Sequence, residues 1–410
     1  MILNKILFIT ESPLSFDLNG AASFSSGHLI ALLQAFPNAE FHIAHLAENN
    51  WITKDEILKF IHKEEFKGTI NLRAIHSQKL KFNILNFGSL VTFSFLNFRK
   101  KAKSLFLNLN ERLSNEMKDL LDTFNPDLIW AEHILPTLLV VQTNSDKPLV
   151  YSHHDFIFRV IEKRNTFSSR NYLRIRLLKN LEHQLIRKIK FFVNGSITEK
   201  QYALKINPGL KTLTFPAVYP NIVFETKEIE LPLKSRIVHL GSFSATANKI
   251  GLKKFFTEVY PPLKKEIKEF EILLIGDNAG ITNDELKWIE HEPKIKILGH
   301  VNELSAILKP YDIHILPYNQ NTGTRTRLLN ALRFKGAVVA YEADINEIPE
   351  LKRGTDYLTA GNYEEFTGAV IRLFKTPALR KDLGDHGFDA VKNYFTIHHL
   401  SGKIKQMLAS

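Results

Sequence analysis

Cysteine is absent from this chain of 410 residues. Without cysteine the fold has no disulfide framework, and no thiolate is available as a nucleophile or a metal ligand. Apolar runs are also short, and none approaches the roughly 18 residues of a membrane-spanning helix. The first strand-like segment, Ile6–Ile9, follows a single lysine rather than the long apolar stretch of a signal peptide. These absences predict a cytoplasmic protein, soluble or bound peripherally at the inner face of the cell membrane.

Acidic residues are fewer than basic ones, and the formal net charge at pH 7 is +11. Such a surplus favours anionic partners, which include nucleic acid, an acidic membrane surface and phosphorylated substrates. The positive charge is spread along the chain, and no basic nucleic-acid-binding motif accompanies it. Nucleic acid is therefore the least favoured of the three partners.

Strands and helices alternate along both halves of the chain, which predicts an α/β fold with doubly wound parallel sheets. Five apolar strands are expected in the second half, at residues 236–240, 271–275, 295–298, 313–316 and 338–340. A polar, proline-bearing segment, 223–235, reads as a linker. We therefore expect a first domain at 1–222, a second at 236–395 and a final helix at 396–410.

The most specific stretch begins at the apolar strand Ile313–Leu316 and passes through a polar loop that contains Gly323. A helical pattern starts at Arg327, and Gly336 stands where a helix C-cap is expected. The next strand, Ala337–Ala340, completes a parallel crossover unit.

Ligands of open α/β sheets bind where a strand ends and its loop begins. Here the loop offers backbone N–H groups and the guanidiniums of Arg325 and Arg327, a combination that suits a diphosphate. A basic, solvated helix start would explain the same residues without any ligand.

Two consecutive strands of the first half end in histidine and carboxylate. Glu132 and His133 follow one strand, and His153, His154 and Asp155 follow the next. Such strand ends gather side chains at one edge of a sheet. A metal site is conceivable there, but no metal-binding spacing supports it, so no metal is expected.

Residues 80–108 interleave aromatic and basic side chains. This pattern suits a segment at a membrane interface, but helices that face the core of the first domain would show it as well. Bases of a nucleic acid could stack on such aromatics, although the mostly apolar run argues against an exposed platform.

The motif Gly323-Thr-Arg-x-Arg327-x-x-Asn330-Ala, continued by Gly336-x-Val-Val, resembles the donor-binding signature of GT-B glycosyltransferases of the retaining family 4 type. In that family a lysine that touches the donor diphosphate stands at the position of Arg327, and a glutamate that holds the ribose stands at that of Asn330. The chain also has one extra residue before Gly336, and Ser242 where the family has arginine. The resemblance covers nearly the whole chain and is most specific between Arg236 and Ala340.

The resemblance implies roles for particular residues. Those implied to be catalytic are His133, Arg327 and Asn330. Those implied to bind the donor are Gly20, Ser242, Asn248, Lys249, Val301, Gly323, Thr324, Arg325 and Leu328. Those implied to lie on the acceptor side are Glu132, His154 and Asp155.

The family's fold implies two Rossmann-like domains that face a cleft, the first binding the acceptor and the second the nucleotide sugar, with the last helix crossing back to the first domain. The implied activity is metal-independent, retaining transfer of a hexose from a nucleotide-diphosphate sugar, with UDP or GDP as the expected nucleotide and no permanently bound cofactor. The expected acceptor is a glycan or lipid-linked sugar in bacterial surface polysaccharide synthesis, with peripheral contact to an anionic membrane.

Two other functions remain open from the sequence. A catalytically weak or inactive GT-B partner is favoured by Asn330 and Ser242, which depart from the family motif. A sugar-nucleotide epimerase or hydrolase of the same shape would need carboxylates for acid–base work, and Glu132 and Asp155 are the obvious ones.

Overall fold

The computed structural model describes residues 3–14, 20–46, 53–59, 66–75, 111–164, 169–215, 218, 236–241, 243, 246–278, 281, 286–301, 303–318, 326–342 and 348–410. The aromatic and basic segment 80–108 and the expected linker 223–235 lie outside these residues. Among the residues described, no helix combines the length and apolar character that crossing a bilayer requires.

The chain forms two compact units. The first comprises Met1–Pro220 and Ile397–Ser410, and the second comprises Asn221–Thr396. The C-terminal helix α15 (Ile397–Ala409) therefore belongs to the first unit, where it packs against α1 (Gly20–Ala35).

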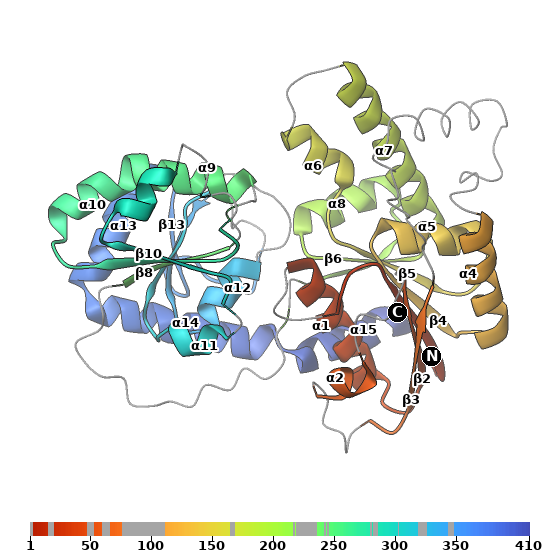
Figure 1. Cartoon of the computed structure of the whole chain (residues 1–410). Helices are drawn as coiled ribbons and strands as arrows, with labels where there is room; N and C mark the ends of the chain where they lie inside the picture. The colour runs from red at the N-terminus through yellow and green to blue at the C-terminus, as the bar shows by residue number, and fades with distance from the viewer. Residues whose placement is uncertain are drawn as a thin grey trace. The chain divides into compact units, whose positions relative to one another are not determined.

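The first unit is built on a seven-stranded parallel sheet with the order β3-β2-β1-β4-β5-β6-β7 (Figure 1). Its strands are β1 Lys5–Thr10, β2 Glu40–His45, β3 Thr69–Ala74, β4 Leu128–Glu132, β5 Leu149–His153, β6 Phe191–Asn194 and β7 Lys211–Thr214. The central strands are apolar along their length because helices cover both faces of a parallel sheet.

Helices α1 and α15 lie on one face of this sheet, and α4, α5 and α7 cover the other (Figure 1). Besides α1 and α15, the helices described here are α2 Lys54–Leu58, α4 Glu111–Phe124, α5 Ile134–Gln142, α6 Ile157–Arg164, α7 Ser169–Lys188 and α8 Ile197–Ile206. Helix α4 shows why these segments fold as they do. Its buried residues Leu113, Met117, Leu120 and Phe124 recur at helical spacing and pack on the sheet.

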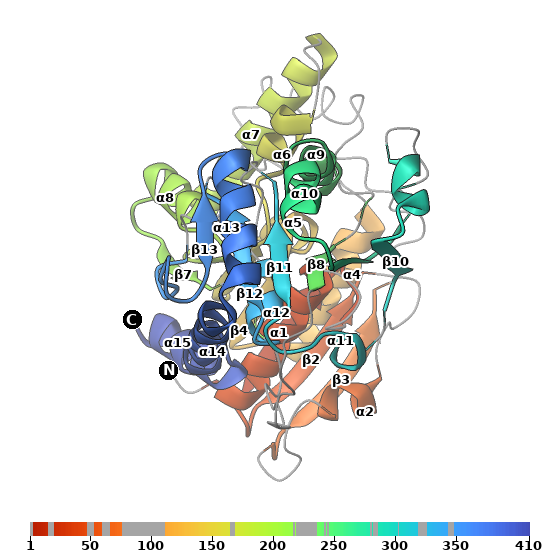
Figure 2. The ribbon, with the colours of Figure 1, turned by 90° about the vertical axis from the view of Figure 1, so that its left-hand side faces the viewer.

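The second unit has a six-stranded parallel sheet with the order β10-β9-β8-β11-β12-β13 (Figure 2). Its strands are β8 Arg236–Leu240, β9 Glu271–Ile275, β10 Ile295–Gly299, β11 Ile313–Leu316, β12 Ala337–Tyr341 and β13 Leu358–Ala360. Its α-helices are α9 Thr246–Lys254, α10 Tyr260–Glu266, α11 Leu304–Ile307, α12 Thr326–Leu332, α13 Tyr363–Lys375 and α14 Pro377–Tyr394. A π-helical turn, Phe255–Val259, joins α9 to α10, and a short 3-10 helix spans Lys287–His291.

Both units are thus doubly wound, and the fold class predicted from the sequence is confirmed. Three strands escaped the sequence analysis, β3, β7 and β13, and each lies at an edge of its sheet. An edge strand is only partly covered, so it lacks the continuous apolar run that marks a central strand.

The apolar pattern of the sequence predicts a loop from Thr10 to Ser26 and a helix from about Gly27 to Ala35, whereas helix α1 begins at Gly20. That expectation is wrong because glycine, alanine and serine carry no apolar periodicity, although Ala22, Ser23 and Ser25 are buried in the helix. Small side chains allow close packing against neighbouring elements, and that gain outweighs the low helix propensity of the glycine and the serines.

Helix α9 packs with backbone contact against the end of β11. A Cβ added at Gly251 would lie 2.9 Å from Tyr318 Cβ and 3.0 Å from Tyr318 Cα. Atoms cannot approach so closely, so only glycine allows this contact.

We therefore expect Gly251→Ala to lower the free energy of unfolding by about 1–3 kcal/mol through overpacking. Gly368→Ala is the matched control, because Gly368 lies in helix α13 with open space around its Cβ position. This control should gain about 0.5–1 kcal/mol, as alanine is the better helix former. Urea denaturation followed by circular dichroism measures both, and equal stability of the two variants would contradict the packing argument.

A buried carboxylate in α7 makes the stability of the first unit depend on pH. Glu182 Oε1 accepts a hydrogen bond of 2.9 Å from the Ile157 N–H, while Oε2 is buried without a partner. Burial, and further the charge of Glu199, raises the pKa of Glu182 well above its usual range. The folded state therefore holds a proton that the unfolded chain releases above about pH 4.5.

Because the folded pKa is raised, wild-type stability should fall as pH increases above 4.5, by up to about 1.4 kcal/mol per pH unit until the folded pKa is reached. Glu182→Gln cannot ionise, so it should gain stability relative to wild type between pH 5 and pH 8, as measured by thermal unfolding. The exposed Glu162→Gln should show no such trend. A constant difference between Glu182→Gln and wild type across this range would refute the assignment.

Candidate active site

In the second unit, β8 and β11 are adjacent although they are far apart in sequence. The chain turns outward in opposite directions from these two strands, and such a switch point is where open α/β sheets bind ligands. Gly241 follows β8 with a φ of 143°, and its N–H donates to the Ile275 carbonyl at 2.8 Å. Helix α9 follows this turn, and α12 follows β11.

The switch point brings together Gly241, Asn248 of α9 and Arg327 of α12. The Arg327 guanidinium donates to Asn248 Oδ1, and its Cζ lies 5.2 Å from the centre of the Tyr318 ring. A Cβ at position 241 would lie 2.6 Å from Arg327 Nε and 3.1 Å from Asn248 Nδ2. Glycine at this strand end thus provides the space in which the guanidinium lies.

Of the other residues predicted to bind the donor, the structure describes only some. Leu328 is buried in the core, and Val301 packs against the apolar cluster under β8. Lys249 is half-buried in α9 next to Asn248, and Asn330 Oδ1 is buried without a hydrogen-bond partner. Ser242, Gly323, Thr324 and Arg325 lie outside the described residues. Gly20 is the first residue of α1, in the first unit.

The first unit has its own switch point between β1 and β4. Ser12 follows β1 and His133 follows β4, and Ser12 Oγ lies 2.7 Å from His133 Nε2. His133 has a φ of 72°, which is uncommon outside glycine. Its N–H donates to the Ser152 carbonyl at 2.9 Å, and its own carbonyl accepts from Thr137 Oγ1 at 2.8 Å. These contacts hold the backbone in its strained conformation.

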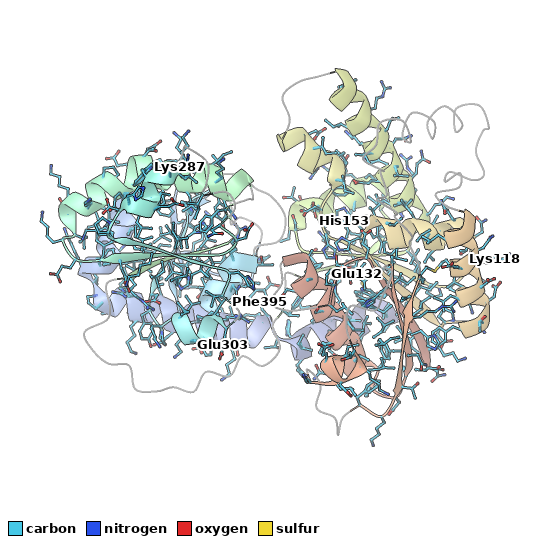
Figure 3. The ribbon with its side chains drawn as sticks, in the orientation of Figure 1. Lys118, Glu132, His153, Lys287, Glu303 and Phe395 are labelled. Carbon is cyan, nitrogen blue, oxygen red and sulfur yellow. The ribbon has the colours of Figure 1, made fainter. Side chains whose placement is uncertain are left out.

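Glu132, the last residue of β4, has no exposed surface. Figure 3 labels it beside His153, at the carboxyl ends of the adjacent strands β4 and β5. Its carboxylate has five side-chain partners, which are His28 Nδ1 at 2.9 Å, Trp130 Nε1 at 2.6 Å, Ser25 Oγ at 3.1 Å, Ser152 Oγ at 2.9 Å and His154 Nε2 at 2.8 Å. Burial alone would raise the pKa of Glu132, but the imidazoles of His28 and His154 outweigh it, and the pKa lies well below its usual range.

His154 connects this carboxylate to His133. The rings of His133 and His154 are stacked, with centroids 3.6 Å apart and planes 26° apart. Burial lowers the pKa of His154, although its hydrogen bond to Glu132 opposes the shift. Burial, and then the charge of His154, hold the pKa of His133 well below its usual range. His133 is therefore a neutral imidazole at physiological pH.

The predicted histidines and acids do not form one cluster. His153 is buried, and its Nδ1 faces Glu199 Oε2 at 3.5 Å, away from the stacked pair. Asp155 is exposed. Over the described ranges, no group of three or more His, Cys, Asp or Glu side chains could hold a metal ion.

Sequence reasoning missed five members of this network, namely Ser12, Ser25, His28, Trp130 and Ser152. Ser12 could have been found, because it follows the first strand at the same sheet edge as His133. Ser25 and His28 lie on α1, whose start the sequence did not reveal, and no motif singles them out.

Comparisons with known proteins agree with this architecture. Residues 234–376 match the family described as glycosyl transferases group 1. A mannosylglucosylglycerate synthase from Thermotoga maritima is 23% identical, over 75% of this chain and 79% of that protein.

Two solved structures illustrate the similarity in fold. HepE from Anabaena, in complex with UDP and glucose, has a TM-score of 0.65 at 14% identity, covering 99% of each chain. Sucrose-phosphate synthase from Thermosynechococcus elongatus has a TM-score of 0.66 at 14% identity, covering 99% of this chain and 98% of that one. The family resemblance stated from the sequence is thereby confirmed. Residues 234–376 thus match the group 1 glycosyl transferases, and the two doubly wound units give the chain the GT-B fold.

Proposed function

We propose that this protein is a retaining, metal-independent hexosyltransferase that moves a sugar from a nucleotide-diphosphate sugar to a glycan or a lipid-linked acceptor in bacterial surface polysaccharide synthesis. The observation that carries the proposal is the Arg327 guanidinium, which Asn248 holds above Gly241 at the switch point of the second unit. A fixed cation at this position suits the diphosphate of a donor.

Arg327 has a direct chemical role in this proposal. As the bond between sugar and diphosphate breaks, negative charge grows on the leaving group. A guanidinium that is already oriented stabilises this charge without further reorganisation, and such stabilisation needs no metal ion. Lys249, Thr324, Arg325 and the backbone from Ser242 and Gly323 would contribute further contacts to the donor.

Asn330 is proposed to bind the donor ribose. Asn330 is half-buried in α12 and its Oδ1 has no hydrogen-bond partner in the structure, so a turn of the side chain toward solvent would let it accept from one ribose hydroxyl. An amide oxygen is a weaker acceptor than the carboxylate found in the family motif, because charge-assisted hydrogen bonds are the stronger ones.

The first unit would supply the groups for the transferred sugar and the acceptor. His133 is neutral and held at a switch point, so its ring can exchange hydrogen bonds with sugar hydroxyls without adding charge. His154 and Asp155 follow the neighbouring strand and are proposed to lie on the acceptor side.

UDP is the first nucleotide to test and GDP the second. Solved structures of HepE contain UDP and UDP-glucose, which motivates the order. For the acceptor, the aromatic and basic segment 80–108 would favour a lipid-linked sugar at the inner membrane surface. The name of the Thermotoga maritima relative makes a glycoside of glycerate the alternative acceptor.

A second candidate function is that of a weak or inactive partner of another transferase. The specific observations in its favour are Asn330 in place of glutamate and Ser242 in place of arginine. Nucleotide binding without turnover would support this candidate, and turnover would exclude it.

We expect one nucleotide among UDP, GDP, CMP, dTDP and ADP to raise the melting temperature of the protein, because a ligand that binds only the folded state stabilises it by mass action. The shift should be the same with Mg²⁺ and with EDTA. Differential scanning fluorimetry at millimolar nucleotide measures both, and the absence of any shift would exclude nucleotide binding.

Arg327→Ala should weaken binding of that nucleotide by about 10- to 100-fold, since a hydrogen bond to a charged group is worth about 1.5–3 kcal/mol. Arg372→Ala is the matched control, because Arg372 is an exposed arginine of the same unit in α13. Isothermal titration calorimetry compares the two. Equal nucleotide affinities of the two variants would show that Arg327 does not bind the nucleotide.

We also expect the product to keep the anomeric configuration of the donor sugar. Proton NMR during turnover distinguishes the two anomers by their coupling constants. An inverted product would contradict the retaining assignment while leaving nucleotide binding by the second unit intact.

A further inference from the structure

We propose that Glu132 is a positioning residue of the transfer reaction, which orients His154 and, through the stacked pair, the ring of His133. This inference rests on the role proposed above for His133. Glu132 itself has no exposed surface, so its carboxylate cannot touch a donor or an acceptor. Any effect that it has on the reaction must pass through its neighbours.

The carboxylate of Glu132 is saturated with donors. A carboxylate offers about four lone-pair sites, and here five side chains point to it from α1, β4, β5 and the residue after β5. A buried charge is stable only when it is paired and fully hydrogen-bonded. This arrangement therefore holds an ionised group in the interior with a fixed orientation.

The ionised carboxylate determines where the protons of two imidazoles lie. Because it only accepts hydrogen bonds, the partner nitrogens, His28 Nδ1 and His154 Nε2, must both carry protons. A neutral His154 then has its lone pair on Nδ1. The hydrogen bond of 2.8 Å also fixes the plane of the His154 ring.

The fixed ring of His154 is the surface on which His133 packs. The centroids lie 3.6 Å apart, and Ser12 Oγ holds the Nε2 atom of His133 at 2.7 Å. One face of the His133 ring and one of its nitrogens are thus restrained by the protein. Its backbone is restrained as well, with a φ of 72°. Such preorganisation holds a group within the narrow tolerance that a reaction geometry requires.

Glutamine has nearly the same size as glutamate, so Glu132→Gln would disturb the hydrogen bonds of this site without changing its packing volume. One carboxylate oxygen becomes an NH₂ group, and this donor would face either His28 N–H and Trp130 N–H or His154 N–H and two hydroxyls. At least one imidazole must then change tautomer or turn. The His133 ring loses its defined support, while Arg327 and Asn248 of the second unit are untouched.

The experiment compares Glu132→Gln with Glu199→Gln. Glu199 is a matched control, because it is a buried carboxylate of the same unit that faces His153 and not the stacked pair. Turnover is measured as release of UDP from UDP-glucose, or of the nucleotide that gave the thermal shift. We expect Glu132→Gln to lower kcat by about 100-fold with KM for the donor unchanged, and Glu199→Gln to retain wild-type kcat.

Nitrogen-15 NMR of labelled histidine provides a readout that needs no substrate. In wild type His154 should be the Nε2–H tautomer, and in Glu132→Gln the ring signals of His154 and His133 should both change. Unchanged ring signals, or changed signals with wild-type kcat, would overturn the proposal. If wild type itself released no nucleotide, the proposed transferase function would fail instead, so the two failures are distinguishable.

A second variant tests whether Glu132 acts on His133 through His154. It also replaces Glu132→Gln as the test if that variant does not fold. His154→Phe keeps a ring for stacking but removes the hydrogen bond to Glu132. It should lower kcat as Glu132→Gln does, and the double variant should be no worse than the more impaired single variant, because both act on one interaction. Additive losses, or wild-type kcat in His154→Phe, would contradict the proposal.

Discussion

The parallel pairing of strands is the constraint from which the rest of the structure follows. Every strand pair described in the two sheets is parallel. Parallel strands require a crossover after each strand, so all strands of a sheet end at the same edge. The order of strands then creates one switch point in each sheet, β1 beside β4 and β8 beside β11.

The two switch points each hold a charged side chain, but they stabilise that charge in different ways. In the first unit an anion, Glu132, is surrounded by N–H and O–H donors until no lone pair is free. In the second unit a cation, Arg327, is held by the neutral amide of Asn248 and by the Tyr318 ring, while a glycine leaves space beside it. A saturated anion can only support its neighbours. A half-buried cation that is held by an amide oxygen and an aromatic ring keeps its charge for a ligand.

Patterns in the sequence were sufficient for the central strands of each sheet and for the edge strand β10, but they missed the other three edge strands. Strands such as β4 and β9 are buried on both faces, so their apolar runs are unbroken and were predicted. Strands β3, β7 and β13 have one neighbour each, and their alternating or short sequences are compatible with loops. Helix α1 was recognised only from its apolar second half, because its first turns are made of small residues that pack closely rather than periodically.

For the site, local patterns were enough to place Glu132 and His133 at a strand end and Arg327 at the start of the helix after β11. The contacts that each of these residues makes could be found only in the folded chain. Side chains alternate along a strand, so His153 turns to Glu199 while His154 turns to Glu132. His28 reaches the same carboxylate across 104 residues of sequence. Hydrogen bonds depend on distance in space, and no local pattern records a partner that a different helix supplies.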